Sequence, residues 1–392
     1  MKNLALVKKT ALSKPKERHG IEYIKKGLIL LTLTTTILFS SCYKTAKVVH
    51  PEMIGQYLEQ ELGPGCVGMQ YAIAKGGNLA INKAIGKAGL ASNGVDIDYH
   101  KFHRKSVHSC SKTITAAALM HVLKGNQVSV DAEIKDYLPS RWDTKGIDGV
   151  TFRELLTHTS GFRGTRDTYA SMRSYIEAGV FQTKGYSYAN VNYSLMRILI
   201  PNINSSIRTL IENVFASYGE IDYAETVSNL YVSYVRDNIL VPAELSPNVA
   251  PKIWDQDQFP TPLYHYNFAN QSITGYSHSD QTLLTGAGGW YMNAKEYTGF
   301  IVYATAGEIP GLDFSQMEKE ELGLYNVTKY GATYYTHNGA SPVSNGRGGY
   351  CVWVNIPATQ TVMVVQVNSR NNTFNVQQLE QTMIEAYLAS IY

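Results

Sequence analysis

Ser109 and Lys112 are the residues whose types and spacing point most directly to chemistry in this chain. They lie three positions apart, just before an Ala- and Leu-rich run, Thr113–Lys124, that predicts a helix ending at Gly125-Asn126. Residues i and i+3 share a helix face, so the lysine amine can reach the serine hydroxyl. A serine becomes a strong nucleophile only when a base takes its proton, and burial lowers a lysine's pKa toward that task. The pair alone is a weak signal, because Ser is also a common N-cap.

Two more motifs carry polar side chains suited to the same chemistry. Tyr188-Ala189-Asn190 lies in a predicted loop before the helical run Ser194–Ile200, and His337-Asn338-Gly339 comes just before the last pair of apolar runs. Each has an ordinary explanation when it is taken alone. Tyr188 is one of 28 tyrosines and can be satisfied by packing, and a loop histidine can bond to backbone.

In this order and spacing the three motifs resemble the serine β-lactamase-related superfamily, which comprises class C β-lactamases, D-alanyl-D-alanine carboxypeptidases, and esterases and D-aminopeptidases of the same fold. The resemblance extends from about Pro64 to Tyr392. Segments that look like the family's helical lobe and later landmarks are Gly125–Asp131, Tyr137-Leu138-Pro139, Val150–Gly161, Gly286–Trp290 and Val364–Asn368.

The resemblance implies a role for each matching position in the first two motifs. Ser109 would be the acylated nucleophile, and Lys112 and Tyr188 would carry its proton to the leaving group. Asn190 would hydrogen-bond Lys112 and the substrate amide. The expected function is that of a serine hydrolase without a cofactor, acting on the amide or ester carbonyl of a small molecule or peptide: a D-alanyl peptide, an ester or a β-lactam.

The third motif implies substrate-binding roles and departs from the family pattern in one residue. The backbone N–H groups of Ser109 and Ala340 would form the oxyanion hole, with Gly339 letting the strand approach closely. His337 replaces a lysine that many β-lactamases carry. A histidine near its reference pKa of about 6.5 is mostly neutral at pH 7. We therefore expect a peptidase or esterase ahead of an efficient β-lactamase, with activity on anionic substrates rising as the pH falls through the histidine pKa.

Two alternatives remain open at this stage. Without rapid deacylation the protein would be a penicillin-binding receptor that traps its acyl-enzyme, and a structural envelope protein is a weaker third interpretation because the motif set is intact. His158 invites a Ser/His triad interpretation. The same segment is scaffold in the family that the chain resembles, so we expect His158 to be structural.

The N-terminus predicts export and lipid anchoring. Residues 1–26 hold eight Lys/Arg against two Glu, and the uncharged 13-residue segment Gly27–Phe39 follows, in the order of a secretory signal and too short to span a bilayer. It ends in Leu38-Phe39-Ser40-Ser41-Cys42, which resembles a bacterial lipobox, and ordinary signal cleavage or an uncleaved anchor are the alternatives. We expect a signal peptide over 1–41, a lipidated Cys42 that starts a tether over 42–50, and a location in the bacterial cell envelope, on its periplasmic or surface side.

Charge and cysteine content exclude other classes. The net charge is +3, so removing the excess of six positive charges in residues 1–26 leaves −3 and no basic stripe for nucleic acid. Histidines are scattered without metal-ligand spacing, and we expect no metal site. Cys66, Cys110 and Cys351 allow at most one disulfide, and their apolar neighbours favour inert thiols. Cys110 is an alternative nucleophile, but the sequence contains none of the partner motifs that a thiol enzyme needs.

Local patterns then predict the elements that position these residues. A helix is expected over Glu52–Leu62, paired strands at Cys66–Ala74 and Leu79–Gly86, a second pair at Gly349–Ile356 and Thr361–Val367, and a final helix over Asn375–Tyr392. Strand pairs at both ends predict an α+β fold, one antiparallel sheet flanked by terminal helices with an inserted helical lobe. We expect a monomeric domain over 51–392, with an α/β lobe at 51–100 and 285–392, a helical lobe at 101–284, and the site between the lobes.

Overall fold

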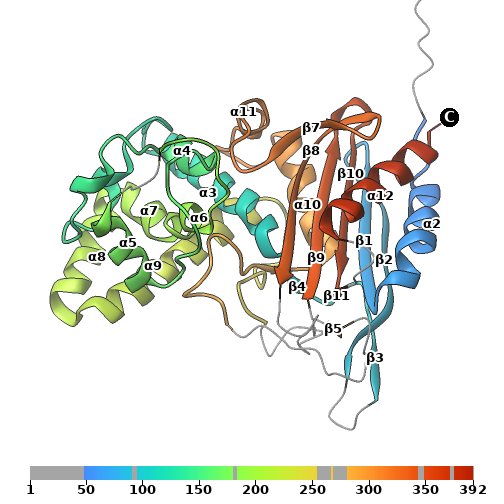
Figure 1. Ribbon diagram of the computed structural model, residues 1–392, viewed down its shortest axis with the longest axis horizontal. Coiled ribbons are helices and arrows are strands. Elements are labelled where there is room, and N and C mark those ends of the chain that lie inside the picture. Colours follow the sequence, from blue (N-terminus) through green and yellow to red (C-terminus); the bar gives the residue numbers. More distant parts are fainter. Residues whose placement is uncertain are drawn as a thin grey trace, which may run out of the picture. The chain divides into compact units, whose positions relative to one another are not determined.

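The computed structural model describes residues 48–90, 95–179, 183–253, 266–267, 280–342, 348–370 and 375–391 (Figure 1). The chain divides into residues 1–48 and a unit over 49–392, which contains every described helix and strand. Cys42 and the expected signal peptide lie outside the described residues. No helix of the described ranges is both long enough and apolar enough to cross a membrane.

One seven-stranded antiparallel sheet, in the order β3-β2-β1-β10-β9-β8-β7, confirms the predicted α+β class. Its strands are β1 (Gly68–Lys75), β2 (Asn78–Leu90), β3 (Asp96–Asp98), β7 (Tyr325–Lys329), β8 (Ala332–Pro342), β9 (Gly348–Ile356) and β10 (Thr361–Val367). The strand pairs predicted at the two ends of the chain meet where β1 pairs with β10, with Met69 opposite Val367. The hairpin β7–β8 was not predicted, and it carries the third motif.

Helices cover both faces of this sheet, so alternate residues of the central strands enter two different cores. Helices α2 (Pro51–Leu62) and α12 (Val376–Ala389) pack on one face, and α10 (Ala294–Ala306) packs on the other (Figure 1). On β9, Val352 and Val354 face α2 and α12, whereas Cys351 and Trp353 face the second core. This two-sided burial explains why the strands appear as nearly continuous apolar runs rather than alternating ones.

The middle of the chain forms the predicted helical part. Its helices are α3 (Ser111–Gly125), α4 (Phe152–Leu156), α5 (Tyr169–Ala178), α6 (Asn190–Ser194), α7 (Met196–Ile203), α8 (Ser205–Tyr218) and α9 (Glu220–Val235), and α11 (Phe314–Glu320) precedes β7. Two short pairings, of β4 (Lys105–Ser106) with β6 (Tyr291–Met292) and of β5 (Tyr266–Asn267) with β11 (Ser369–Arg370), complete the described strands. Helix α3 is buried on all sides and lies between the other helices and the sheet (Figure 1).

Candidate active site

Ser109 lies in a 3₁₀ turn, His108–Cys110, that leads directly into α3. The preceding residue, His108, has a φ of 49°, a left-handed conformation that is unfavourable for a bulky side chain. The turn lies against β8 so closely that a Cβ added to Gly339 would be 2.7 Å from the Ser109 nitrogen. Glycine at 339 therefore lets the strand meet the serine turn, in the way that the family resemblance implied.

Lys112 is fully buried, and its Nζ has three polar neighbours. It lies 3.1 Å from Ser109 Oγ, 2.8 Å from Asn190 Oδ1 and 2.7 Å from the carbonyl oxygen of Ala287. Two of these neighbours, the amide oxygen and the carbonyl oxygen, can only accept. A neutral amine that donates its two N–H bonds to them directs its lone pair at the serine hydroxyl. Burial also lowers the pKa of Lys112 to about 7, so the neutral form is well populated near neutral pH.

Tyr188 lies in the loop before α6, with its hydroxyl hydrogen-bonded to Ser109. Lys112 Nζ is 4.9 Å from the centre of the Tyr188 ring. Burial raises the pKa of Tyr188 above its ordinary value, so the phenol stays protonated at neutral pH. The hydroxyl can therefore accept a proton from one neighbour only while it passes its own to another.

His158 packs against the Tyr188 ring and bonds to the backbone of the same loop. Its ring lies 4.5 Å from the Tyr188 ring, and its Nδ1 accepts hydrogen bonds from the Ala189 N–H at 3.2 Å and from Asn192 Nδ2 at 3.1 Å. Because both partners donate, the proton of the neutral ring is on Nε2. Burial, and then the charge of Lys112, lowers the pKa of His158 to about 3. These contacts fit the structural role expected for this residue.

His337 lies on β8 and is only 2% exposed. Its Nδ1 is 2.8 Å from the carbonyl oxygen of Asn338, and since a carbonyl only accepts, Nδ1 carries the proton. Burial, followed by the charge of Lys112, lowers the pKa of His337 to about 3. The expectation that this histidine titrates near pH 6.5 is therefore wrong, because the ring is shielded from the water that would stabilise its cation.

The three described cysteines are free, as their apolar surroundings suggested. Burial raises the pKa of the Cys66 thiol to about 12 and raises that of Cys110 well above its ordinary value. Cys110 Sγ donates to the carbonyl oxygens of His337, at 3.4 Å, and Cys351, at 3.3 Å. A protonated, buried thiol is a poor nucleophile, so Ser109 is the better candidate. Among the described residues, His, Cys, Asp and Glu side chains form no cluster of three that could hold a metal ion.

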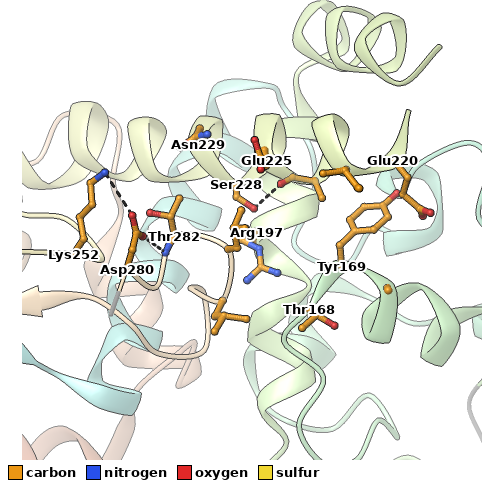
Figure 2. Close-up of a pocket in the computed structure, with 15 residues that line it drawn as sticks. Thr168, Tyr169, Arg197, Glu220, Glu225, Ser228, Asn229, Lys252, Asp280 and Thr282 are labelled. Carbon is orange, nitrogen blue, oxygen red and sulfur yellow. Dashed lines mark hydrogen bonds and ion pairs between the residues drawn. The ribbon is translucent and has the colours of Figure 1, made fainter. Parts of the chain in front are cut away.

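Two of the cavities in the described structure have residues of the helical part in their walls. The larger, of about 790 Å³, is bounded by α5, α9 and residues 280–284 and contains none of the sequence-predicted site residues (Figure 2). Arg197 lies in its interior and donates to the backbone oxygens of Thr285 and Asp167. The second cavity, of about 420 Å³, is lined by His158 and His337, whereas Ser109, Lys112 and Tyr188 are not part of its wall.

Residues 54–388 match the Beta-lactamase family. The chain belongs to the beta-lactamase family. It is 23% identical over 330 residues to PbpX of Bacillus subtilis (strain 168), assigned as a penicillin-binding protein, covering 82% of this chain and 74% of that one. The match confirms the family resemblance inferred from the motifs.

Solved structures show the same fold at low sequence identity. The D-amino acid amidase from Ochrobactrum anthropi SV3, complexed with L-phenylalanine amide, superposes with a TM-score of 0.62 at 17% identity, over 87% of this chain and 99% of that one. The beta-lactamase/D-alanine carboxypeptidase from Yersinia pestis, complexed with citrate, superposes with a TM-score of 0.62 at 13% identity, over 86% of this chain and 97% of that one. The β-lactamase/transpeptidase-like fold predicted from the sequence is thus confirmed.

The structure places Lys112, Tyr188 and Asn190 around Ser109, with Gly339 of β8 against the serine turn, and it adds two residues that sequence reasoning missed. The Ala287 carbonyl is a partner of Lys112, although its segment had been noted only as a family landmark. Tyr325, on the unpredicted strand β7, lies against His337, with the two rings tilted and their centres 5.2 Å apart. The run Tyr334-Tyr335-Thr336, rich in strand-forming residues, was the signal that could have revealed the hairpin.

Proposed function

We propose that this protein is a serine hydrolase that forms an acyl-enzyme on Ser109 with an amide or ester substrate. The observation that carries the proposal is the arrangement around Lys112 Nζ, where two obligate acceptors and the Ser109 hydroxyl surround one buried amine. Only the hydroxyl among these neighbours can donate a proton. The geometry is that of a base held ready to receive it.

The proposed reaction begins with the acylation of Ser109. Ser109 Oγ attacks the carbonyl carbon as Lys112 takes its proton, and the backbone N–H groups of Ser109 and Ala340 stabilise the oxyanion. The proton passes through Tyr188 to the leaving atom as the scissile bond breaks. Water then attacks the acyl-serine ester, which releases a carboxylic acid and returns the proton to Ser109.

The neutral state of His337 supports a substrate without a required carboxylate. A lysine at this position would offer a fixed cation, whereas the buried histidine offers none between pH 5 and 9. We therefore rank esters and amides, including peptides, ahead of β-lactams. The D-amino acid amidase from Ochrobactrum anthropi, which shares this fold, is named for an amide substrate, and this is consistent with the ranking.

A pair of substrates tests the proposal and separates it from its alternatives. The protein is incubated with a fluorescent penicillin and with a chromogenic short-chain ester, in parallel with Ser109→Ala. Turnover of either, lost in the variant, supports a hydrolase. A label that is retained without turnover identifies a penicillin-binding receptor. The absence of both label and turnover refutes the hydrolase and favours a structural protein.

We also propose that the protein is exported and held at the bacterial cell envelope by a lipid on Cys42. The support is the order of the N-terminal sequence, with basic residues, then the uncharged segment Gly27–Phe39, then Cys42. A thioether-linked diacylglycerol with an added N-acyl chain would give stable membrane attachment, which a single chain does not.

A further inference from the structure

Arg197 is a buried cation of α7 that the proposed reaction does not use. It is 1% exposed, and burial lowers its pKa only to about 10, so the guanidinium is charged at neutral pH. Nη1 donates to the Thr285 carbonyl at 2.7 Å and Nη2 to the Asp167 carbonyl at 2.5 Å, while Nε has no hydrogen-bond partner among the described residues. Burying a cation against neutral groups costs stability, so the two carbonyls that it joins indicate its role.

The first of these carbonyls belongs to a segment that also carries a partner of the buried lysine. Three successive carbonyls of this segment each accept a bond from a different side chain, Thr285 from Arg197, Gly286 from Thr115, and Ala287 from Lys112. Thr115 and Lys112 both come from α3, whereas Arg197 reaches the segment from α7. Arg197 therefore holds the backbone two residues before the carbonyl that faces the lysine amine.

The second carbonyl belongs to the loop before α5, which also contacts α6. In this loop Gly164 accepts from the Val191 N–H at 3.2 Å, and Asp167 accepts from Arg197 three residues later. A planar guanidinium fixes the directions of its donors, so two acceptors bonded to it are held in a fixed relation. The arginine thus joins this loop to the 285–287 segment.

The position of the Ala287 carbonyl affects how well Lys112 can act as a base. The amine directs its lone pair at Ser109 while it donates to this carbonyl and to Asn190. Ala287 is also part of the surroundings that bury the amine, and burial is what lowers the pKa of Lys112 to about 7. A segment that moved away would misdirect the amine and admit water, so the lysine pKa would rise toward its ordinary value.

We propose, on the basis of the hydrolase function above, that Arg197 is a positioning residue whose guanidinium joins the 163–167 loop to the 285–287 segment and so keeps the Ala287 carbonyl aimed at Lys112. Arg197 acts through the backbone of this segment and not through contact with the serine. A change at Arg197 should therefore appear in the titration of Lys112, which follows the segment, and not only in the stability of the protein.

Two substitutions test this role through kcat/KM for a neutral chromogenic ester, measured over a pH range that brackets the Lys112 pKa of about 7. Arg197→Met keeps a long side chain but neither bond. It should lower kcat/KM by about ten- to a hundredfold, the cost of a small displacement in a catalytic site, and raise the midpoint of the profile by roughly one pH unit. Arg197→Lys keeps the charge but not the planar fork, so its midpoint should lie between those of the parent and Arg197→Met.

The other titratable groups around Lys112 do not change charge near pH 7, so the midpoint reports the lysine. Burial raises the pKa of three of them above its ordinary value and lowers that of two histidines to about 3, in the order Tyr188, Tyr193, Cys110, His158 and His337.

A matched control separates this role from a general loss of stability. Arg208 also joins two backbone carbonyls, those of Asn202 and Asp136, which lie far along the chain from Ala287. Arg208→Met should leave the midpoint at the parent's value, and the melting temperature of each variant shows how much stability it loses. A midpoint that moves equally in Arg208→Met would show that the loss of any arginine bridge has this effect, and it would overturn the inference.

The midpoint of the Arg197 variants decides the outcome. The parent's midpoint in Arg197→Met, at any rate and melting temperature, overturns the inference. The parent's midpoint in Arg197→Lys overturns it too, because the charge alone would then suffice, and this variant decides by itself if Arg197→Met does not fold. In each case parent activity that is lost in Ser109→Ala leaves the hydrolase intact. A parent without activity that depends on Ser109 refutes the hydrolase, and the inference with it.

Discussion

Replacing Asn190 by Asp should move the pH dependence of activity while keeping a side chain of the same size next to Lys112. The substitution keeps the shape of the side chain but places a carboxylate where Oδ1 now lies, 2.8 Å from Lys112 Nζ. In the parent, the pKa of Lys112 is lowered to about 7 by burial, so about half of the lysine is neutral at pH 7. A negative neighbour favours the ammonium, and we expect the lysine pKa to rise by roughly one to three units.

The size of the effect follows from the neutral fraction of Lys112. At pH 7 that fraction should fall from about one half to between roughly one tenth and one thousandth, which lowers kcat/KM by about five- to five-hundredfold. Activity should recover as the pH is raised. The assay is kcat/KM for a neutral chromogenic ester between pH 5.5 and 9.5. Neither His158 nor His337 interferes in this range, because both pKa values lie near 3.

Two control variants isolate the charge effect. Asn190 Nδ2 donates to the exposed Thr165, so Thr165→Val removes that bond without adding charge and should leave the midpoint of the pH profile in place. Lys105 is a second described lysine whose pKa burial lowers to about 7, and Lys105→Met should also leave the midpoint unchanged. An Asn190→Asp profile that drops equally at every pH, with its midpoint unmoved, would show that Lys112 is not the titrating base.

Three further predictions concern the strand contact, the buried lysine and the anchor. Gly339→Ala should reduce kcat/KM by at least tenfold and lower the melting temperature, because its methyl group would lie 2.7 Å from the Ser109 nitrogen; wild-type values for both would refute this contact. Lys105 donates to the Tyr350 and Val367 carbonyls, and burial lowers its pKa to about 7 in the folded protein. Because the lysine of the unfolded chain has a pKa of about 10.5, the folded state is destabilised by the full cost of burying the charged lysine below pH 7, and this cost disappears as the pH rises to about 10.5. The rise in unfolding free energy between pH 7 and 9.5, measured with urea, should therefore be smaller in Lys105→Met than in the parent; an identical rise would contradict the assignment. Cys42→Ser should release the protein from the membrane fraction or block its processing, and a variant processed and membrane-bound like the parent would exclude lipid anchoring at this residue.

The strand pairs from the two ends of the chain and the helix that follows Ser109 could be predicted because their signals are local. Gly63-Pro64-Gly65 ends α2, and Lys75–Asn78 joins β1 to β2, as expected from their turn residues. The run after Lys112 forms α3 and ends at Gly125, with Asn126 as its C-cap. These features depend on residues within a few positions of one another, and a single sequence contains them in full.

The electrostatics of the site could not be predicted in the same way, because they depend on burial. His337 was expected to titrate near its reference pKa, yet β8 carries it into the protein, where burial, and then the charge of Lys112, lowers its pKa and keeps it neutral. The Ala287 carbonyl reaches Lys112 from 175 positions away. Neither contact leaves a periodic or local pattern, so the family resemblance could name the residues of the site but not their charge states.

The most direct test of the central claim is to locate the acyl group itself. The protein is mixed with a penicillin or a slowly hydrolysed ester, quenched in acid, and mapped by peptide mass spectrometry, with fragment ions that separate Ser109 from its neighbour Cys110. The account predicts one added acyl mass on Ser109. This mass should be absent when the protein is denatured before it is mixed with the reagent, and absent in Ser109→Ala. An acyl group on Cys110 or on another residue, or equal labelling of Ser109→Ala, would contradict it.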